Sequence, residues 1–277
     1  LGIAYRSLSL CECRSSRIFN RISFMKKQVL GIAILIFSFF GCDSEEAPTC
    51  VQTSGEIITE EFSVDAFEEI IVYERVKLFI EQGDEYKVKI ETGENLLENV
   101  FAEVVDNRLE LRNENSCNLF RDYEITKIYV TTQSLNWLQN SSGSAIESVG
   151  TLNFPELWLR SFNQERDPEI HTNGDFILDL EVENLRITND NISNYFLSGN
   201  AENVNLFFAN GDGRLEAGEL IVQHYDVLHR GTNKLIINPQ QSLKGDIFGF
   251  GDIISKNRPP EVDIEEHYTG RLIFEAP

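Results

Sequence analysis

The feature that most constrains the fold is a repeat with a step of twenty residues in the second half of the chain. One column of this repeat is apolar and consists of Ile187, Phe207, Val227 and Ile247. A second column holds the turn-forming residues Asn191, Gly211, Gly231 and Gly251. Glycine and asparagine tolerate a left-handed backbone better than other residues, so this second column predicts a corner at each step.

Apolar columns and corner columns at a fixed period indicate similar turns of chain stacked on one another, with their inward residues forming a continuous core. From residue 56 onward, short runs rich in β-branched and aromatic residues alternate with glycine and asparagine turns. We therefore predict an all-β protein whose C-terminal half is a right-handed parallel β-helix, or β-solenoid, with rungs of about 20 residues. An immunoglobulin-like sandwich would also contain many short strands, but it predicts no fixed step.

Residues 25–42 have the pattern of a bacterial lipoprotein signal. Met25 is followed by Lys26 and Lys27, then by thirteen almost wholly apolar residues, 28–40, and then by Gly41 and Cys42. The apolar stretch is too short to cross a bilayer, which needs about 20 such residues. Residues 39–42 (FFGC) resemble the lipobox, and that resemblance implies that Cys42 is lipidated and becomes the mature N-terminus.

These signals divide the chain into four parts. Residues 1–24 precede Met25 and are interpreted as a spurious upstream extension, with a genuine N-terminal arm as the alternative. Residues 25–41 are the predicted signal peptide. Residues 42–55 are polar and predict a flexible tether, and residues 56–277 predict a single β-solenoid domain.

The remaining cysteines indicate a disulfide. If Cys42 is acylated, Cys50 and Cys117 are left as an even pair in an oxidising compartment, where disulfides persist. We expect them to be bonded to each other, and two free thiols are the alternative.

The charge of the chain excludes one class of partner. Residues 1–41 hold six of the 24 basic and one of the 45 acidic residues, so the remainder carries 18 basic and 44 acidic residues. Such an excess repels nucleic acids and anionic lipid surfaces. We expect no nucleic-acid partner, and we expect the membrane to be reached through the N-terminal lipid, since two or three acyl chains anchor a protein stably.

Several segments in order resemble one known family. Residues 67–72 (FEEIIV) and 76–83 (VKLFIEQG) are similar to its first pair of strands, and residues 142–144, 198–200, 211–213 and 249–251 are similar to its Gly-Ser-Gly corners. Over residues 56–258 the chain resembles the head GIN domain family of putative auto-transporter adhesins, common among Bacteroidetes lipoproteins. The family usually closes with Tyr-x-Gly-x-Pro, whereas residues 254–259 keep only the proline.

This resemblance implies a β-helical fold outside the cytoplasm and a role as an adhesin. Residues 42–46 (CDSEE) also resemble the acidic signal that sends some Bacteroidetes lipoproteins to the outer face of the outer membrane. We therefore expect an outer membrane lipoprotein, facing either the periplasm or the cell surface.

The sequence predicts no catalytic residue, cofactor or metal site. Residues 208–219 have part of the spacing of an EF-hand loop, but Phe208 stands at the first ligand position and cannot bind calcium. His224 and His229 are an odd number of residues apart, so on one strand they face opposite sides. Motifs for a nucleophile elbow, a phosphate loop or dinucleotide binding are absent from the sequence.

The function predicted from the sequence is that of a non-enzymatic, lipid-anchored envelope protein, acting as an adhesin or as a module that binds glycans or surface proteins. The candidate exposed platforms for such a ligand are Trp137, Trp158, Tyr195 and Tyr225. Packing in the core is the alternative for each of them and is the commoner fate of such residues. The alternative functions are a β-helical enzyme that degrades envelope polysaccharides and a purely structural envelope protein. The enzyme would need a basic groove for acidic substrates, and the acidic excess argues against it.

Overall fold

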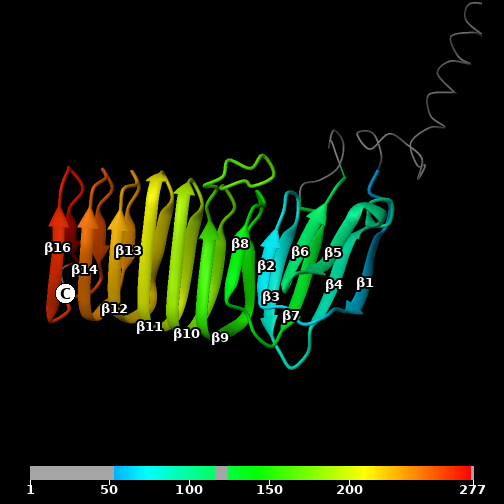
Figure 1. Cartoon of the computed structure of the whole chain (residues 1–277), viewed down its shortest axis with the longest axis horizontal. Helices are drawn as coiled ribbons and strands as arrows, with labels where there is room; N and C mark the ends of the chain where they lie inside the picture. Colours follow the sequence, from blue (N-terminus) through cyan, green and yellow to red (C-terminus); the bar gives the residue numbers. More distant parts are fainter. Residues whose placement is uncertain (1–52, 116–123, 276–277) are drawn as a thin grey trace, which may run out of the picture.

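The computed structural model describes residues 53–115 and 124–275, which form an all-β structure (Figure 1). The predicted lipidation site Cys42 and the predicted disulfide partners Cys50 and Cys117 lie outside the described residues. In the described ranges the one helical element is a 3-10 turn, η1, at Leu97–Asn99. No helix there is long and apolar enough to cross a membrane.

The N-terminal part combines antiparallel and parallel pairs. Its strands are β1 (Ile57–Ser63), β2 (Glu69–Val72), β3 (Lys77–Gln82), β4 (Lys87–Gly93), β5 (Val100–Val105), β6 (Arg108–Asn113), β7 (Lys127–Thr132) and β8 (Trp137–Asn140). Strand β4 pairs antiparallel with β1 and β7, and β5 pairs antiparallel with β6. Strand β2 pairs in parallel with β6 and β8, and β3 pairs in parallel with β7.

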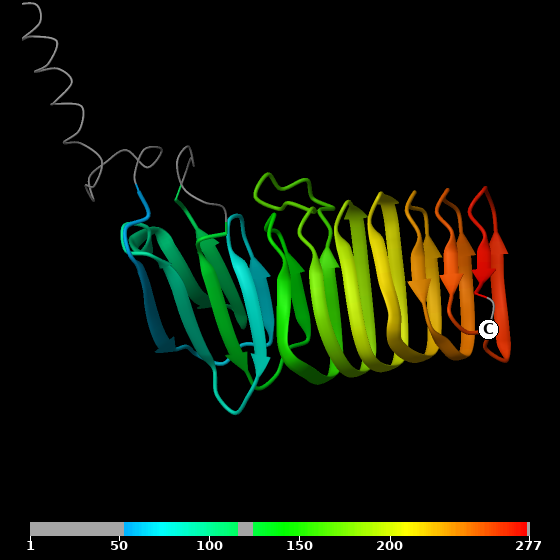
Figure 2. The same cartoon turned by 180° about the vertical axis from the view of Figure 1, so that it is seen from behind.

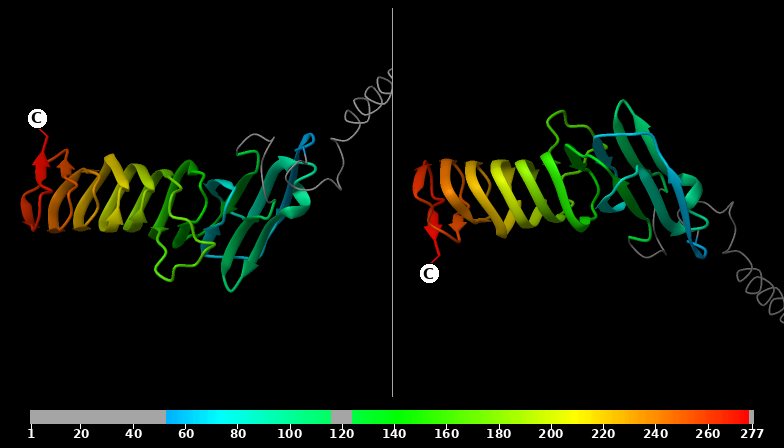
Figure 3. Two further views of the ribbon diagram at one scale, coloured as in Figure 1. Left: turned by 90° about the horizontal axis from the view of Figure 1, so that it is seen from above. Right: turned by 90° about the horizontal axis from the view of Figure 1, so that it is seen from below.

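The C-terminal part pairs only in parallel within its described strands. These are β9 (Ile146–Ser161), β10 (Phe176–Asn191), β11 (Asn194–Gly211), β12 (Arg214–His229), β13 (Leu235–Ile237), β14 (Pro239–Ile247), β15 (Ile253–Ser255), β16 (Glu261–Glu266) and β17 (Leu272–Phe274). Figures 2 and 3 show these turns of chain following one another along the long axis of the molecule. The all-β class predicted from the sequence is confirmed.

The register of the stack differs from the predicted one. Ile187 pairs with Leu206, and Leu206 pairs with Val227, so the first step is nineteen residues and the second is twenty-one. The predicted apolar column is therefore wrong at Phe207, which pairs with Thr188 and Leu228 and faces outward, and Ile247 pairs with His229. The cause is a set of register shifts within the ladders, such as the one between Phe196 and Ser198. Since side chains alternate along a strand, a shift of one residue changes the face.

The corner column is confirmed at two of its four positions. Asn191 has a φ of 107° and Gly211 a φ of 86°, both in the left-handed region. Gly231 and Gly251 are not left-handed, so the predicted backbone is wrong there. At Gly251 the absence of a side chain still matters, because an added Cβ would lie 1.9 Å from the carbonyl oxygen of Asn233 on the preceding turn.

Aromatic rings stack through the core of the C-terminal part. The ring of Phe176 lies parallel to that of Tyr195 with centroids 4.8 Å apart, and Tyr195 meets Phe208 edge-on at 5.8 Å. Phe208 in turn meets the imidazole of His229 edge-on at 6.1 Å. All four side chains are fully buried. His229 is therefore a titratable group within an apolar column.

Acid is expected to destabilise the fold through His229. Its Nε2 lies 3.0 Å from the carbonyl oxygen of Asn233, its Nδ1 has no partner in the described part of the chain, and burial lowers its pKa. The unfolded chain therefore binds a proton at this histidine more readily than the folded chain does. Above about pH 6.5 neither state binds this proton, so the protonation of His229 does not reduce the free energy of unfolding there. Below that pH the free energy of unfolding should fall, by up to about 1.4 kcal/mol per pH unit for this group.

Urea unfolding of the wild type and of His229→Phe at pH 7.5, 6.0 and 5.0 measures this effect. As the pH falls, the free energy of unfolding of the wild type should decrease relative to that of His229→Phe. His224→Gln is the control, because His224 is exposed and should leave the pH dependence unchanged. A constant difference between wild type and His229→Phe would contradict the expectation.

Candidate ligand groove

A groove with a volume of about 910 Å³ crosses the outer surface from β8 to β14. We call it the Trp groove, because Trp137 and Trp158 line one end of it. Its other lining residues include the buried Leu157, Leu185, Val204 and Tyr225 and the polar Asn136, Asn184, Asn203, Asn205, His224 and Ser242. Charged groups are Glu69, Glu156, Arg186, Asp226 and Lys244.

The parallel register builds the groove from two outward columns of side chains. The first column runs through Trp137, Trp158, Arg186, Asn205, Asp226 and Lys244, each paired with the next. The second runs through Glu156, Asn184, Asn203, His224 and Ser242. The residues that stand between the two columns point inward and are buried: Leu157, Leu185, Val204 and Tyr225. Paired strands lie about 4.8 Å apart, so the six members of the first column span about 24 Å.

Arginine side chains stack on both tryptophans. The guanidinium of Arg108 lies 4.5 Å from the ring centroid of Trp137, and that of Arg186 lies 4.1 Å from Trp158. Trp158 is held in place because its Nε1 donates a hydrogen bond of 2.9 Å to Oγ1 of Thr188. Such cation–π contacts fix the planes of the rings and of the guanidinium groups.

A third arginine, Arg160, lies near both tryptophans. Arg160 is half-buried, and its guanidinium lies 5.4 Å from the centroid of Trp158 and 6.0 Å from that of Trp137. Burial lowers the pKa of Arg160, and the positive charges of Arg108 and Arg186 lower it further, against the opposing effect of Asp190. Three guanidinium groups therefore lie together at this end of the groove.

Apart from Glu156, the second column of the groove consists of amide, imidazole and hydroxyl groups. Nδ2 of Asn203 donates a hydrogen bond of 3.1 Å to Oδ1 of Asn184, and Nδ1 of His224 lies 2.9 Å from Oγ of Ser242. Asn184 and Asn203 are exposed, so each amide keeps further donors or acceptors available to a ligand.

The structure brings together two of the four predicted platforms. Trp137 and Trp158 are partly exposed and directly paired. The interpretation of Tyr195 and Tyr225 as exposed platforms is wrong, since they are 0% and 2% exposed. Both occupy inward positions of the strand alternation, and burial raises the pKa of each phenol. Arg186, Asn184 and Asn203 were not predicted as site residues, although the step of nineteen from Asn184 to Asn203 repeats that of the β10–β11 ladder.

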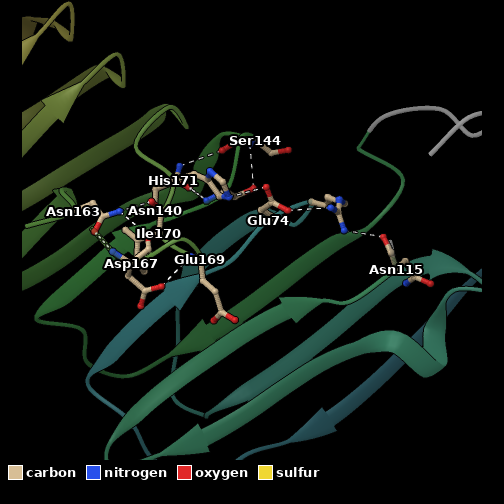
Figure 4. Close-up of polar contacts among 11 residues, drawn as sticks. Glu74, Asn115, Asn140, Ser144, Asn163, Asp167, Glu169, Ile170 and His171 are labelled. Carbon is tan, nitrogen blue, oxygen red and sulfur yellow. Dashed lines mark hydrogen bonds and ion pairs between the residues drawn. The ribbon is translucent and has the colours of Figure 1, made fainter. Parts of the chain in front are cut away.

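A second polar cluster holds the loop of residues 162–175, which connects β9 and β10 (Figure 4). Nε2 of His171 lies 2.7 Å from Oε1 of Glu74, which precedes β3. Nδ2 of Asn163 donates hydrogen bonds of 2.8 Å to the carbonyl oxygens of Asp167 and Ile170. These groups satisfy one another, and we assign them a structural role.

One cluster in the described part of the chain has side chains that could hold a metal ion. Asp246, Glu265 and His267 offer ligand atoms within 4.8 Å of one another near the C-terminal end of the stack. Nε2 of His267 lies 2.6 Å from Oδ1 of Asp246, and its ring stacks on Phe248 at 4.1 Å. Since the histidine and a carboxylate already pair with each other, we assign no metal to this cluster.

Comparison with known proteins identifies similar sequences and folds. The sequence profile of the family described as "putative auto-transporter adhesin, head GIN domain" matches residues 66–259. A putative adhesin from Bacteroides fragilis has a similar structure, with a TM-score of 0.69, 19% identity and coverage of 80% of this chain and 99% of that one. No curated protein matches the chain.

Two further solved structures share the fold. A putative adhesin from Parabacteroides merdae has a TM-score of 0.58 and 17% identity, and covers 80% of this chain and 97% of its own. A protein from Parabacteroides distasonis named as a putative lipid binding protein has a TM-score of 0.55 and 16% identity. The match covers 80% of this chain and 98% of that one. At these identities the likeness concerns the fold alone.

Proposed function

The chain belongs to the head GIN domain family of putative auto-transporter adhesins, and we propose that it is a non-enzymatic protein of the cell envelope that binds an extended ligand in the Trp groove. The observation that carries this proposal is the pair of neighbouring, partly exposed tryptophans at one end of an open groove. Family membership supports a location in the envelope or at the cell surface.

We infer that β9 to β17 wind as a right-handed parallel β-helix. The uniformly parallel pairs within these strands support this inference. The right hand follows from the strong preference of connections between parallel strands. Such a stack would give the groove a rigid wall, because each rung is held by the rungs on both sides.

A glycan is the ligand that the groove fits best. Its length, about 24 Å over six paired strands, suits a chain of several sugars. Indole rings offer apolar faces to sugar rings, and the exposed amides of Asn184 and Asn203 can exchange hydrogen bonds with hydroxyl groups. Binding would need little rearrangement, because the lining residues lie on paired strands rather than on loops.

Truncation of Trp158 is expected to weaken glycan binding. Trp158→Ala removes one stacking face and should raise the dissociation constant at least about tenfold, as loss of a central aromatic contact commonly does. A glycan array followed by titration of the ligands that bind measures this effect. Tyr268→Ala is the control, because Tyr268 is 54% exposed and lies outside the groove. Equal loss in both variants, or none in Trp158→Ala, would contradict the proposal.

We also propose that Cys42 anchors the protein to the membrane through lipid. The pattern of residues 25–42 supports this step, and the acidic residues 43–46 are consistent with export to the outer face of the outer membrane. A fatty-acid analogue fed to the producing cells should label the wild type and should not label Cys42→Ala. Equal labelling of the two proteins would refute the anchor.

A further inference from the structure

Three guanidinium groups gather at one end of the Trp groove, in a chain whose net charge is −21. Arg108, Arg160 and Arg186 gather around Trp137 and Trp158, each within 6.0 Å of at least one indole centroid. Like charges repel, so such a cluster is costly unless negative groups offset it. An arginine of this cluster can attract an anionic ligand if no carboxylate of the protein already neutralises it.

Arg108 is neutralised within the protein, whereas Arg186 is not. Nε of Arg108 donates a hydrogen bond of 2.8 Å to Oε2 of Glu69. At the far end of the groove, Nζ of Lys244 lies 3.0 Å from Oε1 of Glu261. The salt bridges in the described part of the chain do not include Arg186, which is exposed. Among the described residues, Arg186 contacts the face of Trp158, with its guanidinium carbon 4.1 Å from the ring centroid.

A guanidinium that stacks by its face keeps its edge available. The five N–H donors of arginine lie in the plane of the group, and two of them match the two oxygens of a carboxylate. The contact with Trp158, whose indole is itself hydrogen-bonded to Thr188, positions the guanidinium group of Arg186 before a ligand arrives. Less conformational entropy is then lost on binding than with a free arginine side chain.

Arg160 strengthens the attraction for an anion at the same place. It is half-buried, and its Nε has no hydrogen-bond partner among the described residues. Asp190 offsets part of its charge, but the pKa of Arg160 is still lowered by burial and by the two neighbouring arginines. An anion bound at Arg186 would relieve this repulsion.

We propose that the Trp groove recognises a carboxylated sugar, whose carboxylate receives paired hydrogen bonds from Arg186 while neutral sugars of the same glycan lie along Asn203 and Asn205. This inference rests on the proposed function and narrows its ligand to acidic glycans. A densely charged polyanion fits less well, because Asp226 and Glu156 also line the groove. Lys244 is already paired with Glu261, so Arg186 is the unpaired cation among the described residues that line the groove, which suits a glycan whose carboxylates are separated by neutral sugars.

Hyaluronan oligosaccharides test the proposal, because they alternate a uronate with a neutral sugar, and methyl esterification removes their charge without shortening the chain. The two forms are titrated against the wild type, Arg186→Gln and Arg230→Gln. Arg230 is exposed and outside the groove, so its variant makes the same charge change elsewhere. We expect the wild type and Arg230→Gln to bind the acid at least about tenfold more tightly than the ester, with the preference shrinking in high salt.

Arg186→Gln should lose this preference and keep its affinity for the ester. If Arg186→Gln retains the preference, recognition of the carboxylate by Arg186 is refuted. If the wild type binds acid and ester equally, recognition of any carboxylate is refuted, while glycan binding stands in both cases. If the wild type binds neutral glycans of the array and neither form of hyaluronan, the inference fails and the proposed function does not. Absence of binding to every glycan would overturn both. Far-UV circular dichroism of each variant confirms that the fold is retained.

Discussion

Replacing Leu206 with aspartate is expected to remove a large part of the stability of the protein. Leu206 is 1% exposed and pairs with Ile187 and Val227, which are also buried. An unpaired carboxylate at this position would lie inside the apolar core, at a cost of about 4 kcal/mol or more. Domains are commonly stable by only about 5–15 kcal/mol. Urea unfolding followed by circular dichroism should show a much lower midpoint, or no folded baseline.

Two neighbouring positions make this a test of register as well as of burial. Asn205→Asp introduces the same charge at an exposed position and should change stability by less than about 0.5 kcal/mol. Phe207→Asp should cost less than Leu206→Asp, because Phe207 faces outward and is partly exposed. The strict twenty-residue step places Phe207 inward instead. A larger loss for Phe207→Asp than for Leu206→Asp would therefore favour that step and reject the observed ladder.

The sequence predicted the all-β class but not the register of the strands, and the reason lies in the shifts of the ladders. The average step is visible in the sequence, because paired residues in two successive ladders lie nineteen to twenty-one residues apart. The face of each residue depends on single-residue shifts such as that between Asn189 and Asp190. Nothing in the local sequence marks these shifts, because they are set by how two neighbouring turns fit.

The groove could be predicted from the sequence only in part, because the adjacency of its residues also depends on the register of the strands. Aromatic residues are visible in any sequence, and Trp137 and Trp158 were identified as candidate platforms. Their adjacency depends on a step of twenty-one between β8 and β9. Arg186 follows Trp158 at a distance of twenty-eight residues, because the loop of residues 162–175 intervenes. A charged residue at that distance gives no periodic signal, so its contact with Trp158 emerges only from the fold.

The second large effect is expected at Gly211, where a left-handed backbone coincides with a close approach between turns. An added Cβ would lie 2.3 Å from the carbonyl oxygen of Asn191, on the preceding turn. Gly211→Ala should therefore incur both the cost of a left-handed alanine, about 1–2 kcal/mol, and the cost of displacing the backbone of Asn191, about 1–3 kcal/mol. The free energy of unfolding, measured in urea, should fall by the sum of the two.

Two other glycines separate these costs. Gly150 has a φ of 77° and open space around the added Cβ, so Gly150→Ala should show the backbone cost alone. Gly251 is not left-handed, but its Cβ would meet the carbonyl oxygen of Asn233, so Gly251→Ala should show the cost of the close approach alone. The loss at Gly211 should exceed each of these. If Gly150→Ala and Gly211→Ala were equally destabilising, the spacing of turns would tolerate a methyl group, and the tight contact between rungs would not be what selects glycine at this corner.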